Sequence, residues 1–277
     1  MLRIIVDSGS SIRPENMEKY GVDYIVPIRV MLGEEDYLDG VNIDNDVFYD
    51  KIINEKIFPK TSLPALADLD SKVEEYTQNG DDVFIITIAS GISGTYNALR
   101  LAYEDNPKVH VLDSISAVGG VIILVNEINK NKDKMSIEEL INMFEDLKKR
   151  IVIYAIPETL TYLYRGGRLS KTEYLLGSII GIKPIIGIAN NKVCMLGKSI
   201  GLNRTMKKIS EDVMKDFDAN YPVVAEYTFK DDNLDKLIRK TDESFTNNII
   251  CKDNLSYAIA AHWGPNAFGF VYIKKSN

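Results

Sequence analysis

The first half of the chain alternates short apolar runs with longer amphipathic stretches. The apolar runs are rich in β-branched residues, which is typical of strands buried on both faces of a parallel sheet. These runs are Leu2–Val6, Val83–Ile88, Val109–Leu112 and Ile151–Ile156. The amphipathic stretches predict helices at Leu66–Gln78, Thr95–Glu104, Ala117–Asn131 and Ser136–Lys149. This alternation predicts an α/β domain with helices on both faces of a mainly parallel sheet.

The pattern changes after Pro157, where hairpins join the helices. Strand-like segments on both sides of Asn190-Asn191, a natural turn pair, predict a hairpin of Lys183–Ala189 and Lys192–Gly197. Further strands are expected at Pro222–Phe229, Thr246–Cys251, Tyr257–Ala261 and Phe268–Lys274, and helices at Leu202–Phe217 and Asn233–Thr241. We therefore expect an α+β domain with a largely antiparallel sheet over residues 158–277. The α/β domain then covers residues 1–157, with an extra hairpin arm at Tyr24–Leu32 and Asp36–Leu38.

Composition and charge narrow the class of protein. The 277 residues are 45% hydrophobic and 26% charged, as in ordinary soluble globular chains. A formal net charge of −7 argues against a nucleic-acid partner. No apolar stretch approaches the roughly 20 residues that span a bilayer, and the first residues are typical of a strand rather than a signal peptide. Cys194 and Cys251 lack the spacing of a zinc site or disulfide framework. We expect a cytoplasmic protein without stable membrane insertion and without a metal.

A serine-rich corner follows the strand Val83–Ile88 and raises the question of a hydrolase. The nucleophile elbow of hydrolases has the pattern G-x-S-x-G, but around Ser93 its last position is Thr95. The chain has two histidines: His110 lies inside a predicted strand, whereas His262 lies beside a Gly-Pro loop. A serine hydrolase that uses Ser93 and His262 is therefore one hypothesis.

The same atoms suit a binding site. The Ser93 hydroxyl and the Gly94 amide can donate hydrogen bonds to an anion at the end of a strand, where ligands of α/β proteins gather. Thr61 and Ser62, in "KTSLPA", form a second cluster of donors. Each cluster is also compatible with a plain helix N-cap. A sugar or ketone phosphotransfer protein is a third hypothesis, but it needs a phosphoacceptor histidine near a strand end, and His110 is expected in mid-strand.

Six segments, in order along nearly the whole chain, resemble motifs of the DegV family of bacterial fatty-acid-binding proteins. They are "VDSGSS", "KTSLPA", "ASGISGTYNA", "LDSISAVGG", "LTYLYRGGRLS" and "AAHWGPNAFGF". "IKPIIGI" fits between the last two. The chain departs from the family pattern at Trp263, which puts a large ring beside His262, and at Asn266, which replaces the second glycine of H-x-G-P-G. These departures bear on the chain length of the ligand and on the affinity for a partner.

The resemblance implies an α/β domain followed by an α+β domain, with a long-chain fatty acid between them. It implies that Thr61, Ser93 and His262 hold the carboxylate, with Ser62 and the Gly94 amide alongside. It also implies a carrier protein without catalytic residues or a cofactor, which presents the acid to a fatty acid kinase. Ser93 would then be a hydrogen-bond donor, not a nucleophile.

Two further expectations concern the partner and the acyl chain. Arg168, in "YRGGRLS", matches an arginine of the family pattern, and we expect it to contact the kinase or the ligand phosphate, apart from the head-group motifs. Candidates for the apolar lining, each also compatible with ordinary core, are Ile92, Leu163, Ile179, Ile180, Ile182 and Phe268.

Overall fold

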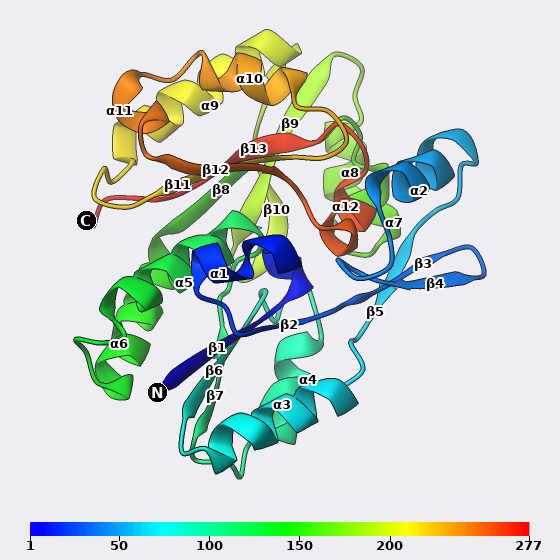
Figure 1. The fold of residues 1–277 in the computed structure, drawn as a ribbon. Coiled ribbons are helices and arrows are strands. Elements are labelled where there is room, and N and C mark those ends of the chain that lie inside the picture. The colour runs from blue at the N-terminus through cyan, green and yellow to red at the C-terminus, as the bar shows by residue number, and fades with distance from the viewer. Residues whose placement is uncertain (277) are drawn as a thin grey trace.

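A parallel sheet forms the centre of the first part of the molecule (Figure 1). The computed structural model describes residues 1–276. The strand order is β2-β1-β6-β7, and every neighbouring pair is parallel. The strands are β1 (Leu2–Asp7), β2 (Tyr24–Val26), β6 (Asp82–Thr87) and β7 (Val109–Asp113). The predicted parallel sheet is therefore confirmed, and His110 lies within β7.

Helices cover both faces of this sheet because alternate residues of each strand point to opposite sides. Ile5 and Ile85 pack with α3 (Ala67–Gln78) and α4 (Thr95–Ala102). On the other face, Ile4, Phe84 and Ile86 belong to a larger core with α5 and α6. These helices span Gly119–Asn131 and Ile137–Leu147. The burial of the central strands β1 and β6 on both faces explains why the sequence has continuous apolar runs there.

A six-stranded sheet forms the second part, in the order β10-β9-β8-β13-β11-β12. Only β11 and β12 are parallel; the other neighbours are antiparallel. The strands are β8 (Ile151–Ile156), β9 (Ile182–Ala189), β10 (Lys192–Ile200), β11 (Val223–Tyr227), β12 (Ile249–Asn254) and β13 (Phe268–Ile273). Its helices are α9 (Leu202–Asp216), α10 (Asp232–Ile238) and α11 (Glu243–Thr246). The largely antiparallel second sheet is confirmed, as is the hairpin at Asn190 and Asn191, which both have positive φ.

Two predictions about this region were wrong. β8, expected in the parallel sheet, pairs antiparallel with β13 and β9. A short apolar run does not reveal the direction of its neighbours. The chain thus enters the second sheet at Ile151; the domain boundary at residue 157 stays a prediction. Tyr257–Trp263, expected as a strand over its first residues, is helix α12. Its residues Tyr257–Ala261 are buried throughout, so no period distinguishes helix from strand.

A small antiparallel sheet, β4-β3-β5, forms an arm beside α12 (Figure 1). Its strands are β3 (Arg29–Leu32), β4 (Glu35–Leu38) and β5 (Lys60–Ser62). The hairpin of β3 and β4 confirms the predicted arm, although Tyr24–Val26 belongs to the large parallel sheet. The remaining α-helices are α1 (Met17–Tyr20), α2 (Asn45–Tyr49), α7 (Thr161–Arg165) and α8 (Lys171–Gly177). Across residues 1–276, no helix is both long and apolar enough to cross a membrane.

Candidate functional site

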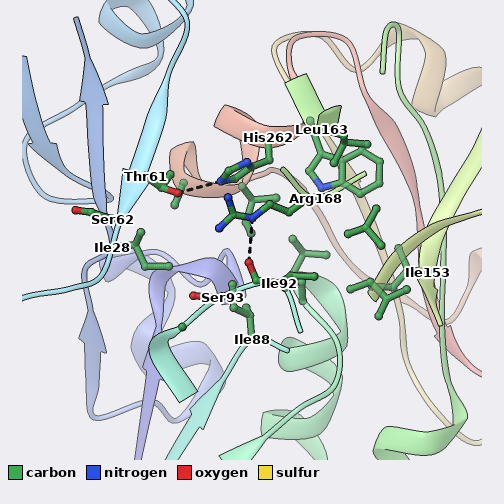
Figure 2. Close-up of a pocket in the computed structure, with 18 of the residues that line it drawn as sticks. Ile28, Thr61, Ser62, Ile88, Ile92, Ser93, Ile153, Leu163, Arg168 and His262 are labelled. Atoms are coloured by element: carbon green, nitrogen blue, oxygen red, sulfur yellow. Dashed lines mark hydrogen bonds between the residues drawn. The ribbon is translucent and has the colours of Figure 1, made fainter. Parts of the chain in front are cut away.

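A largely apolar cavity of about 280 Å³ lies where the two large sheets and the arm meet (Figure 2). Its apolar walls come from both halves of the chain, for example Ile88 at the end of the parallel sheet and Ile153 in β8. Its polar residues come from β5, the corner after β6, the segment after α7, and α12. These residues are Thr61, Ser62, Ser93, Gly94, Arg168 and His262. All five residues predicted for the head-group site therefore line one cavity, together with Arg168.

Thr61 and His262 are joined directly in this cavity (Figure 2). The distance between Thr61 Oγ1 and His262 Nε2 is 2.9 Å. Thr61 is brought there by β5, which pairs with β3 in the arm. His262 is brought there by the last turn of α12, whose packing is apolar. The two motifs are far apart in the sequence and form one polar group.

His262 is a neutral imidazole in this environment. Burial, reinforced by the charge of Arg168, lowers the pKa of His262 to about 3. Its Nδ1 atom is buried and has no hydrogen-bond partner within residues 1–276. A neutral ring with its proton on Nε2 avoids an orphaned N–H group, because Nε2 then donates to Thr61 Oγ1. The hydroxyl hydrogen of Thr61 is then free for an acceptor in the cavity.

Ser93 lies at the corner between β6 and α4, at the carboxyl end of the parallel sheet. Its Oγ atom lies 2.9 Å from Thr95 Oγ1 and accepts a hydrogen bond from the Thr95 amide. In the described part of the chain, the hydrogen bond of His262 is to Thr61, and none joins Ser93 to His262. The site thus lacks the serine–histidine pair on which the hydrolase hypothesis depends.

Arg168 reaches into the same cavity, which the sequence analysis did not expect (Figure 2). Its Nε atom donates to the Ile92 carbonyl at 3.0 Å, and Nη1 donates to the Gly166 carbonyl. Among residues 1–276, no carboxylate forms an ion pair with it, and burial lowers the pKa of its guanidinium. A partly buried cation without a counter-ion calls for an anionic ligand. The expected separation of Arg168 from the head-group motifs was therefore wrong; contact with a kinase stays a prediction.

The other lining predictions have mixed outcomes. Ile92 and Leu163 line the cavity, whereas Ile182 and Phe268 do not. Ile179 and Ile180 are exposed at the surface of the molecule. Ser62 is exposed, and its hydroxyl points away from His262 (Figure 2). With the exposed Gly94, Ser62 marks the polar end of the cavity as its opening to solvent.

The "VDSGSS" motif lies behind the cavity and connects the elements that carry its polar residues. Asp7, at the end of β1, accepts a hydrogen bond from the Ile88 amide at 3.0 Å. Ser11 Oγ accepts from the Ser256 amide, directly before α12. Asp39, at the end of β4, accepts from the Tyr257 amide at 2.9 Å and so caps the helix that carries His262. Sequence reasoning noted this motif but assigned it no role.

Comparison with known proteins gives a consistent picture. A family model described as "Uncharacterised protein, DegV family" matches residues 1–275. A DegV domain-containing protein of Clostridium acetobutylicum is 30% identical over 99% of both chains. A fatty acid (stearic acid)-binding protein from Eubacterium ventriosum has a TM-score of 0.84 and 26% identity over 99% of both chains. A fatty-acid-binding DegV family protein from Thermus thermophilus, at 24% identity over 99% of both chains, has the same fold with a TM-score of 0.86.

Proposed function

The chain belongs to the DegV family, and from this premise we propose that it binds one long-chain fatty acid. The carboxylate lies among Thr61, Ser93, Arg168 and His262, and the acyl chain fills the apolar cavity. One observation carries this proposal: Arg168 is a cation that no carboxylate of residues 1–276 pairs with, at the polar end of a cavity with apolar walls. The similar protein from Eubacterium ventriosum, which binds stearic acid, supports the choice of ligand.

The expected energetics favour such a ligand. Burying about 14 methylene groups contributes on the order of 11 kcal/mol before the costs of association. Removing a carboxylate from water costs several kcal/mol unless it is hydrogen-bonded and paired. The Arg168 guanidinium pairs with it, and the hydroxyls of Thr61 and Ser93 and the Gly94 amide donate to it. The apolar cavity therefore sets the affinity, and the polar group fixes the direction of the acid.

His262 has a different role from the one that a charged imidazole would play. Because its pKa is lowered to about 3, it stays neutral at physiological pH and contributes no positive charge. It orients Thr61 through the bond between Nε2 and Oγ1. Arg168 supplies the charge instead.

We further propose that the protein is a cytoplasmic carrier, without a cofactor or catalytic residues, that presents its acid to a fatty acid kinase. The kinase transfers the γ-phosphoryl group of ATP to a carboxylate oxygen, which yields an acyl phosphate and ADP. The exposure of Ser62 and Gly94 supports this proposal because it leaves the carboxylate end accessible from outside. The missing hydrogen bond between Ser93 and His262 in the described residues disfavours the alternative, an esterase.

The first experiment is denaturing extraction of purified protein followed by lipid mass spectrometry. We expect one fatty acid per chain. Delipidated protein should gain thermal stability on addition of a long-chain acid, because the ligand binds only the folded state. If no acid from medium to long chain length raises the melting temperature, the proposal is wrong. Turnover of a p-nitrophenyl ester would favour the hydrolase.

A further inference from the structure

A second, smaller cavity adjoins the first one. Its volume is about 30 Å³, and its lining includes Ala267 and Phe270. Three residues line both cavities: Val118, Ile153 and Trp263. Because the same side chains border both spaces, they form the partition between them.

Trp263 is the largest of these three residues, and its ring packs against two clusters of the core. It packs against the central core on one side and against the cluster of Leu160 and Leu163 on the other. The next residue, Gly264, has a φ of +72°, and a Cβ atom there would lie 2.3 Å from the Tyr162 ring. The Gly264 carbonyl accepts a hydrogen bond from Thr228 Oγ1 at 2.7 Å. The backbone directly after Trp263 is therefore constrained, and the packing of the indole against both clusters places it in the partition.

We propose that Trp263 limits the length of the acyl chain that the cavity accepts; this inference rests on the proposed function. An apolar cavity of about 150 Å³ holds a benzene molecule, so the first cavity has room for roughly a dozen carbon atoms beyond the opening. The second cavity is lined mostly by apolar residues and would receive the end of a longer chain. The indole separates the two spaces.

The experiment compares acids of increasing chain length on delipidated wild-type protein and on Trp263→Leu. Each further buried methylene raises the affinity about fourfold, whereas a methylene that is not accommodated does not. We expect the wild-type affinity to rise up to about 14 to 16 carbons and then level off or fall. In Trp263→Leu the rise should continue for two to three more methylenes, so the affinity ratio of the longer to the shorter acid increases roughly 15- to 60-fold. Trp263→Phe should have an intermediate effect.

Two controls identify the partition as the cause. Leu163→Ala also enlarges the first cavity, but Leu163 does not border the second one, so the length preference should not move. Adding Ala267→Val to Trp263→Leu fills the second cavity, and it should reduce the gain for longer acids. If Leu163→Ala shifts the preference as much as Trp263→Leu does, the proposal is wrong.

Trp263 is the only tryptophan of the chain, so its fluorescence reports on the acyl chain in the wild-type protein itself. We expect acids of about 14 carbons to change its emission saturably, and octanoate to bind without this change. Suppose that long acids bind without changing the emission of the wild type, and that Trp263→Leu has the same length preference as the wild type. The role of Trp263 is then refuted, and the proposed function stands. If no acid binds to any variant, the proposed function itself fails.

Discussion

His262 Nε2 lies 2.9 Å from Thr61 Oγ1, although the two residues are 201 positions apart in the sequence. This contact joins the arm to α12 and places a neutral imidazole behind the hydroxyl that faces the cavity. Under the proposed function, the ring orients a hydrogen-bond donor for the ligand, and among residues 1–276 its hydrogen bond is to Thr61 and not to Ser93.

Replacing Thr61 by Val keeps the shape of the side chain and removes its hydroxyl. A hydrogen bond to a charged group contributes about 1.5–3 kcal/mol, so we expect the affinity for a fatty acid to fall roughly 10- to 100-fold. His262→Ala should have a similar effect, because Thr61 loses its orienting partner. The measurement is calorimetric titration of delipidated protein at pH 7. An unchanged affinity in Thr61→Val would place the carboxylate elsewhere.

Ser93→Ala distinguishes a hydrogen-bond donor from a nucleophile. As one donor among several, Ser93 should contribute about 10- to 100-fold in affinity, and its loss should not abolish binding. Ser90→Ala is the matched control: Ser90 accepts a hydrogen bond from Asn191 Nδ2 and does not line the cavity, so affinity should be unchanged. Covalent labelling of wild-type Ser93 by a fluorophosphonate, abolished in His262→Ala, would instead establish a hydrolase.

Arg168→Met removes the positive charge from the cavity and retains an apolar stem. Because the carboxylate would then be partly buried without a counter-ion, we expect at least a 30-fold loss of fatty acid affinity. The matched control is Arg165→Ala, since Arg165 is exposed and stacks over the Phe58 ring outside the cavity. Equal losses in both variants would indicate a general effect of charge. If Arg168→Met keeps its fatty acid but the kinase no longer phosphorylates that acid, Arg168 contacts the kinase and not the ligand.

The stability of the protein should depend on pH through Asp7. Burial raises the pKa of this carboxyl group to about 7, whereas it is near 3.8 in the unfolded chain. Between these values the folded state holds a proton that the unfolded state has released, so the contribution of Asp7 to stability falls as pH rises through this range. Asp7→Asn keeps an acceptor for the Ile88 amide but cannot ionise.

The difference in unfolding free energy between Asp7→Asn and the wild type should therefore grow from about pH 4 to about pH 7, by at most about 1.4 kcal/mol per unit. Outside this range it should be constant. Urea unfolding from pH 4 to pH 8 measures it. His262 acts in the opposite direction in the wild type, because its lowered pKa makes stability rise with pH from about 3 to 6.5. Because Asp7→Asn retains His262, this contribution is the same in both proteins and cancels in their difference in unfolding free energy. A pH-independent difference would mean that Asp7 is ionised throughout.

The sequence by itself determined most of the local structure and the family of the chain. Apolar runs with β-branched residues identified the buried strands of the parallel sheet, since such strands are buried on both faces. Asn190-Asn191 identified the hairpin of β9 and β10, because asparagine tolerates the positive φ that this turn requires. Motif order identified the family and, with it, Thr61, Ser93 and His262.

The tertiary structure alone decided which elements are neighbours and what surrounds each side chain. Nothing in the Ile151–Ile156 run specifies an antiparallel partner, and Tyr257–Ala261 is apolar at every buried position, so neither pairing nor helix was predictable. Arg168 was expected apart from the head group because it lies in a Gly-rich segment outside the head-group motifs; the fold brings it into the cavity, where no carboxylate of residues 1–276 pairs with it. The pKa of His262 follows from burial and from that guanidinium. Burial and proximity arise from segments far apart in the chain, and local patterns do not carry that information.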